Sequence, residues 1–490
     1  MSPPRPQTPS KRNVRGNRAH ATRGQTGIGA GVRSKNDTFG TRGHGCAFGT
    51  RTTGTGSPEN GKNNPKDGTG LQDDGVSRSL SFQAIDAPEK RDSMNPRTIP
   101  GLYHERVQRY GDRIGSYYRD PSTGQWHSQS WSDGFEQVKA LANGLYALGV
   151  TAGDRVGILS ETRVEWVLAD LAIVNMGAIT VGVYATSTVE QTGYILKHAG
   201  VEVVFVEDWS QYEKVKEAAK IAKCIRSIVL MEDGERARST KATDWESLIS
   251  MGQEFGHENP DTYEEGWRSI RPDALAMLVY TSGTTGPPKG VMLTHKNIYR
   301  TIEAIASTLP TDNDLGVVFL PLSHSLQRVA GYAGIYTGGT AVFAERLDKI
   351  VDHMREFRPT VQASVPRIYE KIHTKIRAQV EEASPARQKV FHWAVDVGLQ
   401  ISRLRRANKR VPMHLAAQHR LADKLVLSKI RDVFGGNIRY MLSGAAPIAE
   451  ELLEFFHACG VVILEGYGLT ETTAPATVNR LENFRFGTVG

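Results

Sequence analysis

A polar loop between two apolar segments constrains this chain more than any other feature. The loop is Tyr280–Gly290, which reads Tyr-Thr-Ser-Gly-Thr-Thr-Gly-Pro-Pro-Lys-Gly. The apolar runs Leu275–Val279 and Val291–Leu293, on either side of it, predict buried strands. Glycines let the loop backbone adopt positive φ angles and approach a ligand closely. Successive backbone N–H groups in such a turn form a concavity that attracts anions.

The loop also carries the side-chain donors that a phosphate site needs. Hydroxyl groups donate hydrogen bonds, and a lysine adds a positive charge. A Walker loop is excluded, because Pro288 precedes Lys289 and Gly290 follows it, where that motif requires Gly before the lysine and Ser or Thr after it. A plain surface turn is the alternative interpretation. The candidate phosphate-binding residues are Thr281, Ser282, Gly283, Thr284, Thr285, Gly286 and Lys289.

A second informative segment, Leu464–Glu471, reads Leu-Glu-Gly-Tyr-Gly-Leu-Thr-Glu. A predicted strand ends here in a turn that presents a hydroxyl and a carboxylate together. Thr470 has a hydroxyl that donates to a phosphate oxygen, and Glu471 is a hard oxygen ligand of the kind that Mg²⁺ takes beside substrate phosphates. The ring of Tyr467 is suited to packing on adenine. The alternative is an ordinary helix start with Thr470 as its N-cap.

Two further turns follow predicted strands. Ser443–Pro447 has small residues that leave room for a planar ring, although an ordinary turn with Pro447 at the first helical position is the favoured interpretation of this segment by itself. Pro321–His324 ends in a histidine, a residue that near an apolar segment is usually structural. His295, directly after the phosphate loop, is interpreted as a helix-start residue.

Apolar strands alternate with helical patterns along the chain, which predicts an α/β fold with parallel, doubly wound sheets in two lobes. Order is expected from about Thr98 onward. The polar stretch 232–272 predicts a connection with one short helix near Trp245–Leu248, and 367–432 is predominantly helical. The predicted strands are Trp126–Trp131, Asp154–Leu159, Ala178–Val183, Val203–Val206, Ile225–Leu230, Val317–Leu320, Thr340–Phe343, Val361–Val365, Ile438–Leu442 and Val461–Leu464.

The first 95 residues differ in composition from the rest. They are rich in Gly, Thr, Asn, Pro and Arg and poor in large apolar residues, which predicts a disordered basic leader. A targeting peptide and a nucleic-acid-binding tail are less favoured alternatives, and no nucleic-acid partner is expected. The three cysteines, Cys46, Cys224 and Cys459, have no metal-ligand spacing and suit a reducing, cytoplasmic location.

Four of these segments occur in the order typical of the acyl-adenylating (AMP-forming) superfamily, which the chain from 96 to 490 resembles. The longer helical insertion Ala383–Gly435 and the segment Val365–Lys371 are most similar to the long-chain fatty acid–CoA ligases. The resemblance implies an N-terminal core of two αβα lobes. Long-chain members often have glutamate before the arginine that follows the histidine, whereas here Gln327 precedes Arg328.

The resemblance also implies roles for individual residues. Lys289, Thr470 and Glu471 are the expected catalytic residues, with Glu471 holding Mg²⁺, and His324 is expected at the mouth of the acyl pocket. The expected adenine-binding residues are Gly444, Ala445, Ala446, Glu465, Gly466, Tyr467 and Gly468.

The implied reaction joins a long-chain fatty acid to CoA, with ATP and Mg²⁺, through an acyl-adenylate. Transfer of the acyl group to a carrier protein, and a non-catalytic nucleotide- or lipid-binding remnant, are the alternatives. The chain is expected to be a C-terminal truncation with impaired activity, because the family's small C-terminal domain and its lysine are not seen in it. The basic cluster Arg403–Arg410 suggests peripheral contact with anionic lipid, with a solvated helix face as the favoured alternative.

Overall fold

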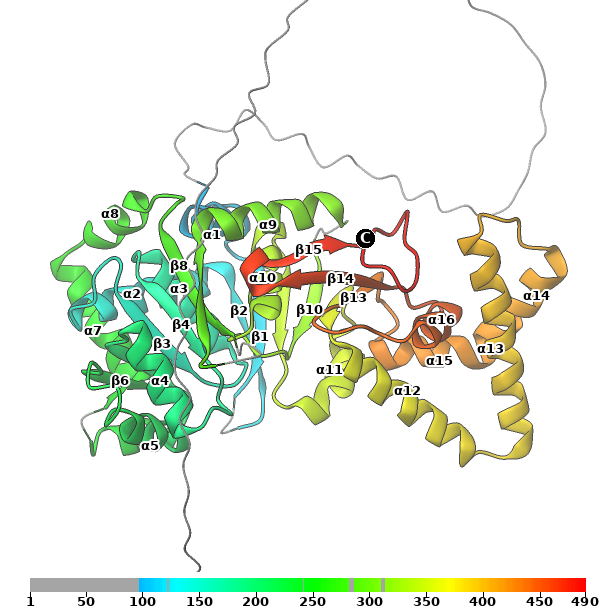
Figure 1. Ribbon diagram of the computed structural model, residues 1–490, viewed down its shortest axis with the longest axis horizontal. Coiled ribbons are helices and arrows are strands. Elements are labelled where there is room, and N and C mark those ends of the chain that lie inside the picture. The colour runs from blue at the N-terminus through cyan, green and yellow to red at the C-terminus, as the bar shows by residue number, and fades with distance from the viewer. Residues whose placement is uncertain (1–96, 121–122, 241, 282–285, 310–312) are drawn as a thin grey trace, which may run out of the picture. The chain divides into compact units, whose positions relative to one another are not determined.

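The computed structural model describes residues 97–490, apart from 121–122, 241, 282–285 and 310–312 (Figure 1). The predicted leader and four residues of the phosphate loop, Ser282, Gly283, Thr284 and Thr285, therefore lie outside the described residues. The first described helix, α1 (Ile99–Tyr110), begins next to Thr98, whose hydroxyl accepts a hydrogen bond from the Gly101 amide. The start of order near Thr98 stays a prediction, because residues 1–96 lie outside the described residues.

The larger of the described sheets has seven strands in the order β7-β6-β5-β3-β4-β8-β9. All neighbouring pairs are parallel except β8 and β9, which form an antiparallel hairpin at one edge. This is the predicted doubly wound arrangement. Its strands are β3 (Arg155–Leu159), β4 (Ile179–Val183), β5 (Val203–Val206), β6 (Ser227–Leu230), β7 (Thr243–Asp244), β8 (Leu275–Thr281) and β9 (Lys289–Thr294).

The remaining described strands form two four-stranded sheets. One has the order β10-β11-β1-β2, with β1 parallel to β11 and antiparallel to β2. The other has the order β12-β13-β14-β15. Their strands are β1 (Ile114–Arg119), β2 (Trp126–Ser130), β10 (Leu315–Val318), β11 (Thr340–Phe343), β12 (Val361–Ser364), β13 (Tyr440–Ser443), β14 (Ile463–Leu469) and β15 (Ala474–Val478).

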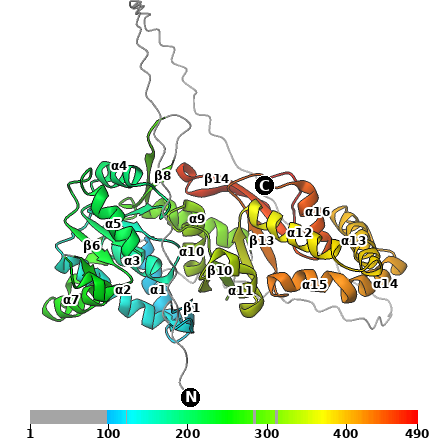
Figure 2. The ribbon, with the colours of Figure 1, turned by 90° about the horizontal axis from the view of Figure 1, so that it is seen from below.

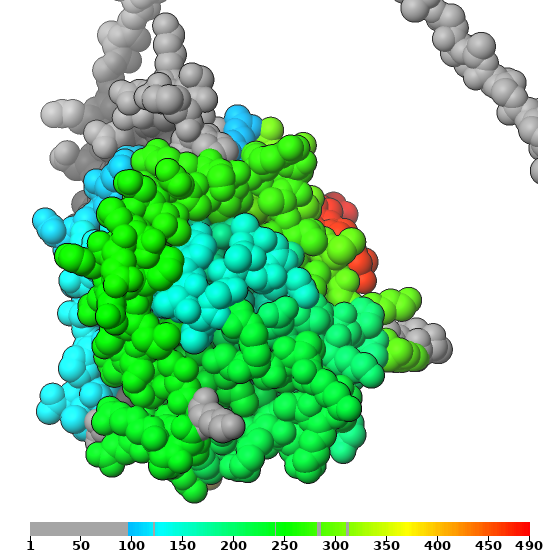
Figure 3. All heavy atoms as spheres, turned by 90° about the vertical axis from the view of Figure 1, so that its left-hand side faces the viewer, coloured from blue at the N-terminus to red at the C-terminus, as the bar shows by residue number. Residues whose placement is uncertain are grey.

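Helices pack on both faces of the seven-stranded sheet, as parallel strands require (Figures 1 and 2). Figure 3 shows that cyan and green segments, the first half of the described chain, cover this side of the molecule. The helices in the first half of the described chain, after α1, are α2 (Trp131–Ala147), α3 (Val164–Asn175), α4 (Val189–Ala199), α5 (Trp209–Ala218), α6 (Gly234–Ala237), α7 (Trp245–Glu258), α8 (Thr262–Ser269), α9 (His295–Thr308) and α10 (Ser325–Thr337).

The third sheet packs against a second apolar core, which includes Tyr369, Phe434 and Phe456. The helices of this part are α11 (Ile350–Phe357), α12 (Pro366–Glu381), α13 (Pro385–Arg406), α14 (Met413–Ala422), α15 (Ser428–Arg431) and α16 (Glu450–Ala458). Two arginines of the predicted basic cluster, Arg403 and Arg406, form ion pairs with Glu454 on α16. No helix of the described residues combines the length and the apolar character needed to cross a membrane.

The sequence interpretation was wrong for the stretch 232–272. It contains two substantial helices, α7 and α8, in place of one short helix. The apolar faces of these helices pack against the core of the large sheet. Three of their aromatic side chains are buried in that core: Trp245, Tyr263 and Trp267. Gly252 of α7 meets α2 so closely that a Cβ there would lie 1.8 Å from the Ala140 carbonyl oxygen. Tertiary packing therefore stabilises α7 and α8, which the polar composition of this stretch did not predict.

A buried ion pair joins α3 of the large sheet to α10. Arg328 Nε donates to Asp170 Oδ2 at 3.0 Å, and Arg328 Nη2 donates to the other carboxylate oxygen. Tyr332 and Thr180 also donate to this carboxylate, each at 2.7 Å. Both charged side chains are almost fully buried, at 2% and 4% exposure. The carboxylate thus accepts four hydrogen bonds that link two helices and a strand.

We predict that Asp170→Ala lowers the free energy of unfolding by about 3–5 kcal/mol, because it leaves the buried Arg328 charge without its partner. Urea unfolding followed by circular dichroism measures the change. The matched control is Asp348→Ala, which removes the partner of Arg346 in an exposed ion pair and is expected to cause no measurable change. Equal stability of the two variants would contradict the importance assigned to the buried pair.

Two buried histidines, His104 and His295, and the half-buried His457 make the fold sensitive to acid. Burial lowers the pKa of His104, His295 and His457 from the ordinary value of 6.5 to about 4. Between these two values the unfolded chain binds more protons than the folded chain, so stability falls as the pH falls. Each histidine contributes up to about 1.4 kcal/mol per pH unit in this window.

We therefore expect His295→Asn to flatten the fall in unfolding free energy between pH 6.5 and pH 4. The Asn oxygen can replace Nδ1 as the acceptor of the Ile99 amide hydrogen bond, which keeps the local structure. Urea titrations at several pH values measure the slope, with His392→Asn at an exposed site as the control. An unchanged slope in His295→Asn would show that this ring does not drive the acid sensitivity.

Candidate active site

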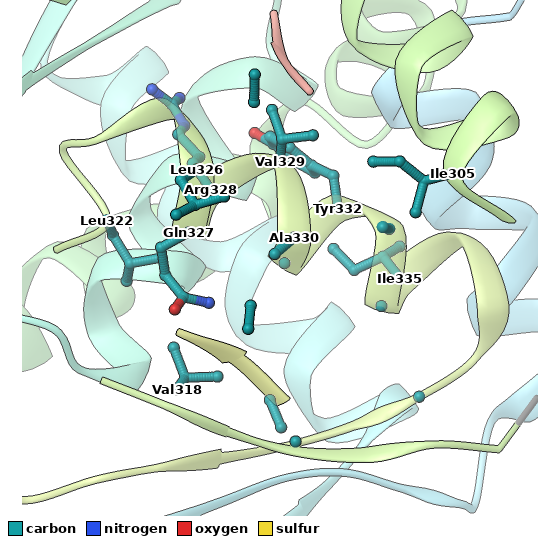
Figure 4. A pocket seen from close by; sticks show the side chains of 18 of the residues that line it. Ile305, Val318, Leu322, Leu326, Gln327, Arg328, Val329, Ala330, Tyr332 and Ile335 are labelled. Carbon is teal, nitrogen blue, oxygen red and sulfur yellow. The ribbon is translucent and has the colours of Figure 1, made fainter. Parts of the chain in front are cut away.

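A cavity of about 680 Å³ lies where the three sheets meet. Its wall includes residues of α3, α9 and α10 and of strands from each sheet. Figure 4 shows that side chains of α10 project into this region beside Ile305 of α9 and Val318 of β10. Most of the labelled side chains are apolar, so the cavity offers an apolar interior with few polar groups.

The loop predicted to bind phosphate connects β8 to β9 at the edge of the large sheet. Thr281, the last residue of β8, pairs with Lys289, the first residue of β9, and Thr281 also lines the cavity. Lys289 is exposed, and Gly286 has a φ angle of +101°, as the sequence argument for glycine required. The hairpin therefore brings the first and last of the predicted phosphate-binding residues side by side.

Both ends of this loop are held by α4. Tyr194 donates a hydrogen bond to the Pro288 carbonyl oxygen at 3.1 Å, and His198 Nδ1 lies 2.8 Å from the Tyr280 hydroxyl oxygen. The rings of Tyr194 and His198 are stacked, with centroids 5.4 Å apart. A Cβ at Gly290 would lie 3.1 Å from the Tyr280 ring, so glycine avoids a tight contact here. Two side chains one helical turn apart thus position the strands on either side of the loop.

The second predicted motif lies beside this hairpin. β9 packs against the short turn η4 (Thr470–Thr472), which contains Thr470 and Glu471. Thr470 is buried, and its hydroxyl oxygen lies 3.2 Å from that of Ser325 at the start of α10. Glu471 is exposed, and both residues line the cavity. Segments that are far apart in the chain therefore meet at one end of the cavity.

The sequence predicted a turn over Glu465–Leu469, and this was wrong. The segment continues β14 and pairs with β15 in an antiparallel ladder with an irregularity after Tyr467. Nor does Thr470 cap a helix, since it begins the short turn η4. Pairing with β15 holds the segment Gly466–Leu469 in place. Gly468 lies so close to β15 that a Cβ there would be 1.9 Å from the Ala474 carbonyl oxygen.

The backbone near the cavity is strained at three residues that are not glycine. Ala445, Thr473 and Ala474 have φ angles of +69°, +64° and +71°. Such conformations cost about 1–3 kcal/mol each and cluster at functional sites. Two of the three, Ala445 and Ala474, line the cavity, so part of its wall is built from backbone in an unfavourable conformation.

The predicted adenine-binding residues are divided by the structure. Gly444, Ala445, Gly466, Tyr467 and Gly468 line the cavity. Ala446 is exposed next to them. Glu465 is buried and faces elsewhere, because its carboxylate accepts a hydrogen bond from the Gly487 amide at 3.1 Å. Burial raises the pKa of this carboxyl.

His324 is the N-cap of α10 and also lines the cavity. Its Nδ1 accepts a hydrogen bond from the Leu326 amide at 3.1 Å, so the neutral ring carries its proton on Nε2. Burial lowers its pKa, which favours this neutral form. The ring therefore has one N–H donor left for a ligand.

Sequence reasoning missed the buried ion pair of Asp170 and Arg328 and the contacts of Tyr194 and His198 with the phosphate loop. The sequence did contain an indication of the ion pair, because Asp170 is the one charged residue in the otherwise apolar centre of α3. Its partner lies 158 residues away, which no local pattern reveals. In the described part of the chain, no three His, Cys, Asp or Glu side chains gather closely enough to hold a metal by themselves.

Solved structures share this architecture. The N-terminal domain of FACL13 from Mycobacterium tuberculosis superposes with a TM-score of 0.56 at 19% identity, covering 79% of each chain. The adenylation domain of a carboxylate reductase from Mycobacterium chelonae gives a TM-score of 0.57 at 22% identity, covering 76% of this chain and 58% of that one. At these identities the similarity establishes the fold alone, and it confirms the α/β class predicted from the sequence.

Sequence comparison finds relatives among the long-chain-fatty-acid–CoA ligases. ACSBG2 of Xenopus laevis is 31% identical over 409 residues, and FadD15 of Mycobacterium tuberculosis is 32% identical over 371 residues. These alignments cover 81% and 75% of this chain but only 54% and 60% of the relatives, so the chain spans less than two thirds of their length. The family described as AMP-binding enzyme matches residues 103–490, and the chain therefore belongs to the AMP-binding enzyme family.

Proposed function

We propose that this chain supplies the ATP- and acyl-binding core of a long-chain fatty acid–CoA ligase. In this reaction a fatty carboxylate attacks the α-phosphate of ATP, giving acyl-adenylate and pyrophosphate, and the CoA thiol then displaces AMP. The observation that carries the proposal is the meeting of the phosphate-loop hairpin with Thr470 and Glu471 at an apolar cavity of about 680 Å³. The similarity to ligases whose names specify long-chain fatty acids supports the choice of substrate.

The polar groups at this end of the cavity suit a triphosphate. Thr281 and Lys289 bind the β- and γ-phosphates together with the loop between them, and Thr470 donates to the α-phosphate. Gly444 and Ala445 leave space for the adenine ring, which packs on Tyr467. Adenylation of this kind depends mainly on positioning and on stabilisation of charge.

The residues present also fit Mg²⁺. This ion often binds through one or two carboxylates and the oxygens of a substrate phosphate, without a protein cage. Glu471 is an exposed carboxylate on the cavity wall and would be its protein ligand. When bound, Mg²⁺ neutralises part of the phosphate charge.

The apolar part of the cavity takes the acyl chain. Burying each methylene group of a fatty acid contributes about 0.8 kcal/mol, so the binding free energy grows with the length of the acyl chain that the cavity encloses. The remaining N–H of His324 is a donor for the fatty carboxylate at the polar end. Exclusion of water by the acyl chain strengthens the electrostatic contacts at that end.

We predict that Lys289→Ala weakens ATP binding about tenfold, because a hydrogen bond from a charged group to phosphate contributes about 1.5–3 kcal/mol. Isothermal titration of the 490-residue chain with ATP and Mg²⁺ measures the dissociation constant. The matched control is Lys296→Ala, an exposed lysine on α9, which is expected to bind ATP like the parent chain.

Glu471→Gln completes this experiment, because it is expected to remove the dependence of ATP affinity on Mg²⁺ concentration while the chain stays folded. Trapping of acyl-adenylate from ATP and palmitate tests the reaction itself. The proposal fails if the parent chain binds ATP no better than Lys289→Ala and forms no adenylate.

Tyr194→Phe tests whether α4 positions the loop. Loss of the hydrogen bond to Pro288 is expected to weaken ATP binding about threefold, while fatty acid binding stays unchanged. Tyr146→Phe, on the half-buried tyrosine of α2, is the control. An equal loss of affinity for ATP and fatty acid would indicate a general loss of structure and would contradict a positioning role.

A further inference from the structure

Two glycines of α10, Gly331 and Gly334, present bare backbone to the cavity. Both line it, and Gly331 is exposed and Gly334 half-buried, whereas Val329 and Tyr332 on the same helix are buried. The two glycines are three residues apart in sequence, so they lie on one face of the helix. A Cβ built at either of them would meet no described atom within 4 Å. The open space of the cavity therefore reaches the helix backbone at these positions.

Glycines in other helices of the fold have a packing role that these two lack. A Cβ at Gly144 of α2, Gly252 of α7 or Gly398 of α13 would lie 2.5, 1.8 or 2.5 Å from a carbonyl oxygen of a neighbouring helix. Those glycines let two helices approach closely. Among the described residues no such neighbour faces Gly331 or Gly334, and neither has the positive φ angle that favours glycine. Packing and backbone conformation therefore do not explain them.

Glycine in the interior of a helix also lowers stability. It is less favourable there than alanine, because its backbone loses more conformational freedom on folding. Alanine would fit at both positions of α10, since the space for a Cβ is free. The fold thus keeps part of the cavity open at the expense of helix stability, which is explained if a ligand lies against the helix there.

The order of residues along α10 relates the two glycines to the acyl chain. His324 caps the helix, and Gly331 and Gly334 follow it by seven and ten residues. At a rise of 1.5 Å per residue, they lie about 10 and 15 Å from the cap along the helix axis. If the fatty carboxylate meets His324, as the proposed function has it, a chain that runs along α10 passes Gly331 first and Gly334 later.

We propose that Gly331 and Gly334 set the length of acyl chain that the cavity accepts. They act as specificity-determining residues, because the absence of side chains leaves a channel along α10 for the distal methylene groups of a long, unbranched chain. This inference rests on the proposed function, in which the cavity holds the acyl chain. A side chain at Gly334 would fill the channel and shorten the chain that fits, while the reaction itself is unchanged.

The test measures the binding of saturated fatty acids from decanoate to palmitate, so it does not require turnover. Trp131 and Trp166 line the cavity, and their fluorescence reports its occupation. In the parent 490-residue chain, each added methylene group is expected to tighten binding about fourfold. In Gly334→Leu the affinity is expected to stop rising at a shorter chain. Palmitate should then bind about tenfold more weakly than to the parent chain, whereas decanoate should bind equally well to both.

Gly331→Ala tests whether glycine is needed for the fold. Because the space for its Cβ is free, this variant is expected to shift the folding equilibrium about two- to fivefold toward the folded state. Urea unfolding followed by circular dichroism measures the shift. The control for added bulk is Ala417→Leu, at an exposed position of α14 outside the cavity, which should keep the parent dependence of affinity on chain length.

The outcomes distinguish this inference from the proposed function. If Gly334→Leu weakens the binding of all the acids equally, or leaves palmitate binding unchanged, the inference is overturned while the acyl cavity stands. A loss of stability in Gly331→Ala would show that the fold itself requires glycine, and it would overturn the inference as well. If no fatty acid binds to the parent chain, the proposed acyl cavity fails together with the inference.

Discussion

The contact between Asp170 and Arg328 is the constraint on which the arrangement of the site depends. It joins α3, which packs on the large sheet, to α10, which carries His324, Ser325 and Gln327 into the cavity. Ser325 in turn contacts Thr470, so the position of the second motif is tied to the same helix. A buried charge pair of this kind is a costly way to gain stability. Its geometry nevertheless specifies how α10 lies against α3, and with it the shape of the cavity.

The phosphate loop depends on a second, independent support. An antiparallel hairpin at the edge of a parallel sheet ends near the carboxyl ends of the neighbouring strands, where ligands bind in folds of this class. Tyr194 and His198 then hold its two strands from α4. Side chains of α4 therefore hold the chain at Tyr280 and at Pro288, on either side of residues 282–285.

Much of the large sheet could be predicted, because β3, β4 and β5 are short apolar runs that alternate with helical segments. The pairing of β1 with β11 could not, since Ser116 and Ala341 are brought together only by the tertiary fold. In the site, composition pointed to Lys289, Thr470 and Glu471 as groups for phosphate and metal. It did not reveal that the Glu465 carboxylate accepts a hydrogen bond from the Gly487 amide, because a local pattern does not show a contact made 22 residues away.

The left-handed backbone at Ala445, Thr473 and Ala474 has a consequence for how this protein can change. Glycine adopts such angles without penalty, so each of these positions could be relieved by a single substitution. The chain instead has alanine or threonine at these positions, and two of them, Ala445 and Ala474, line the cavity. Replacing one of these residues with glycine would relieve the strain, but it would also give the backbone more conformational freedom at that position. A gain in thermal stability at these positions would therefore come with a less rigid backbone beside the cavity.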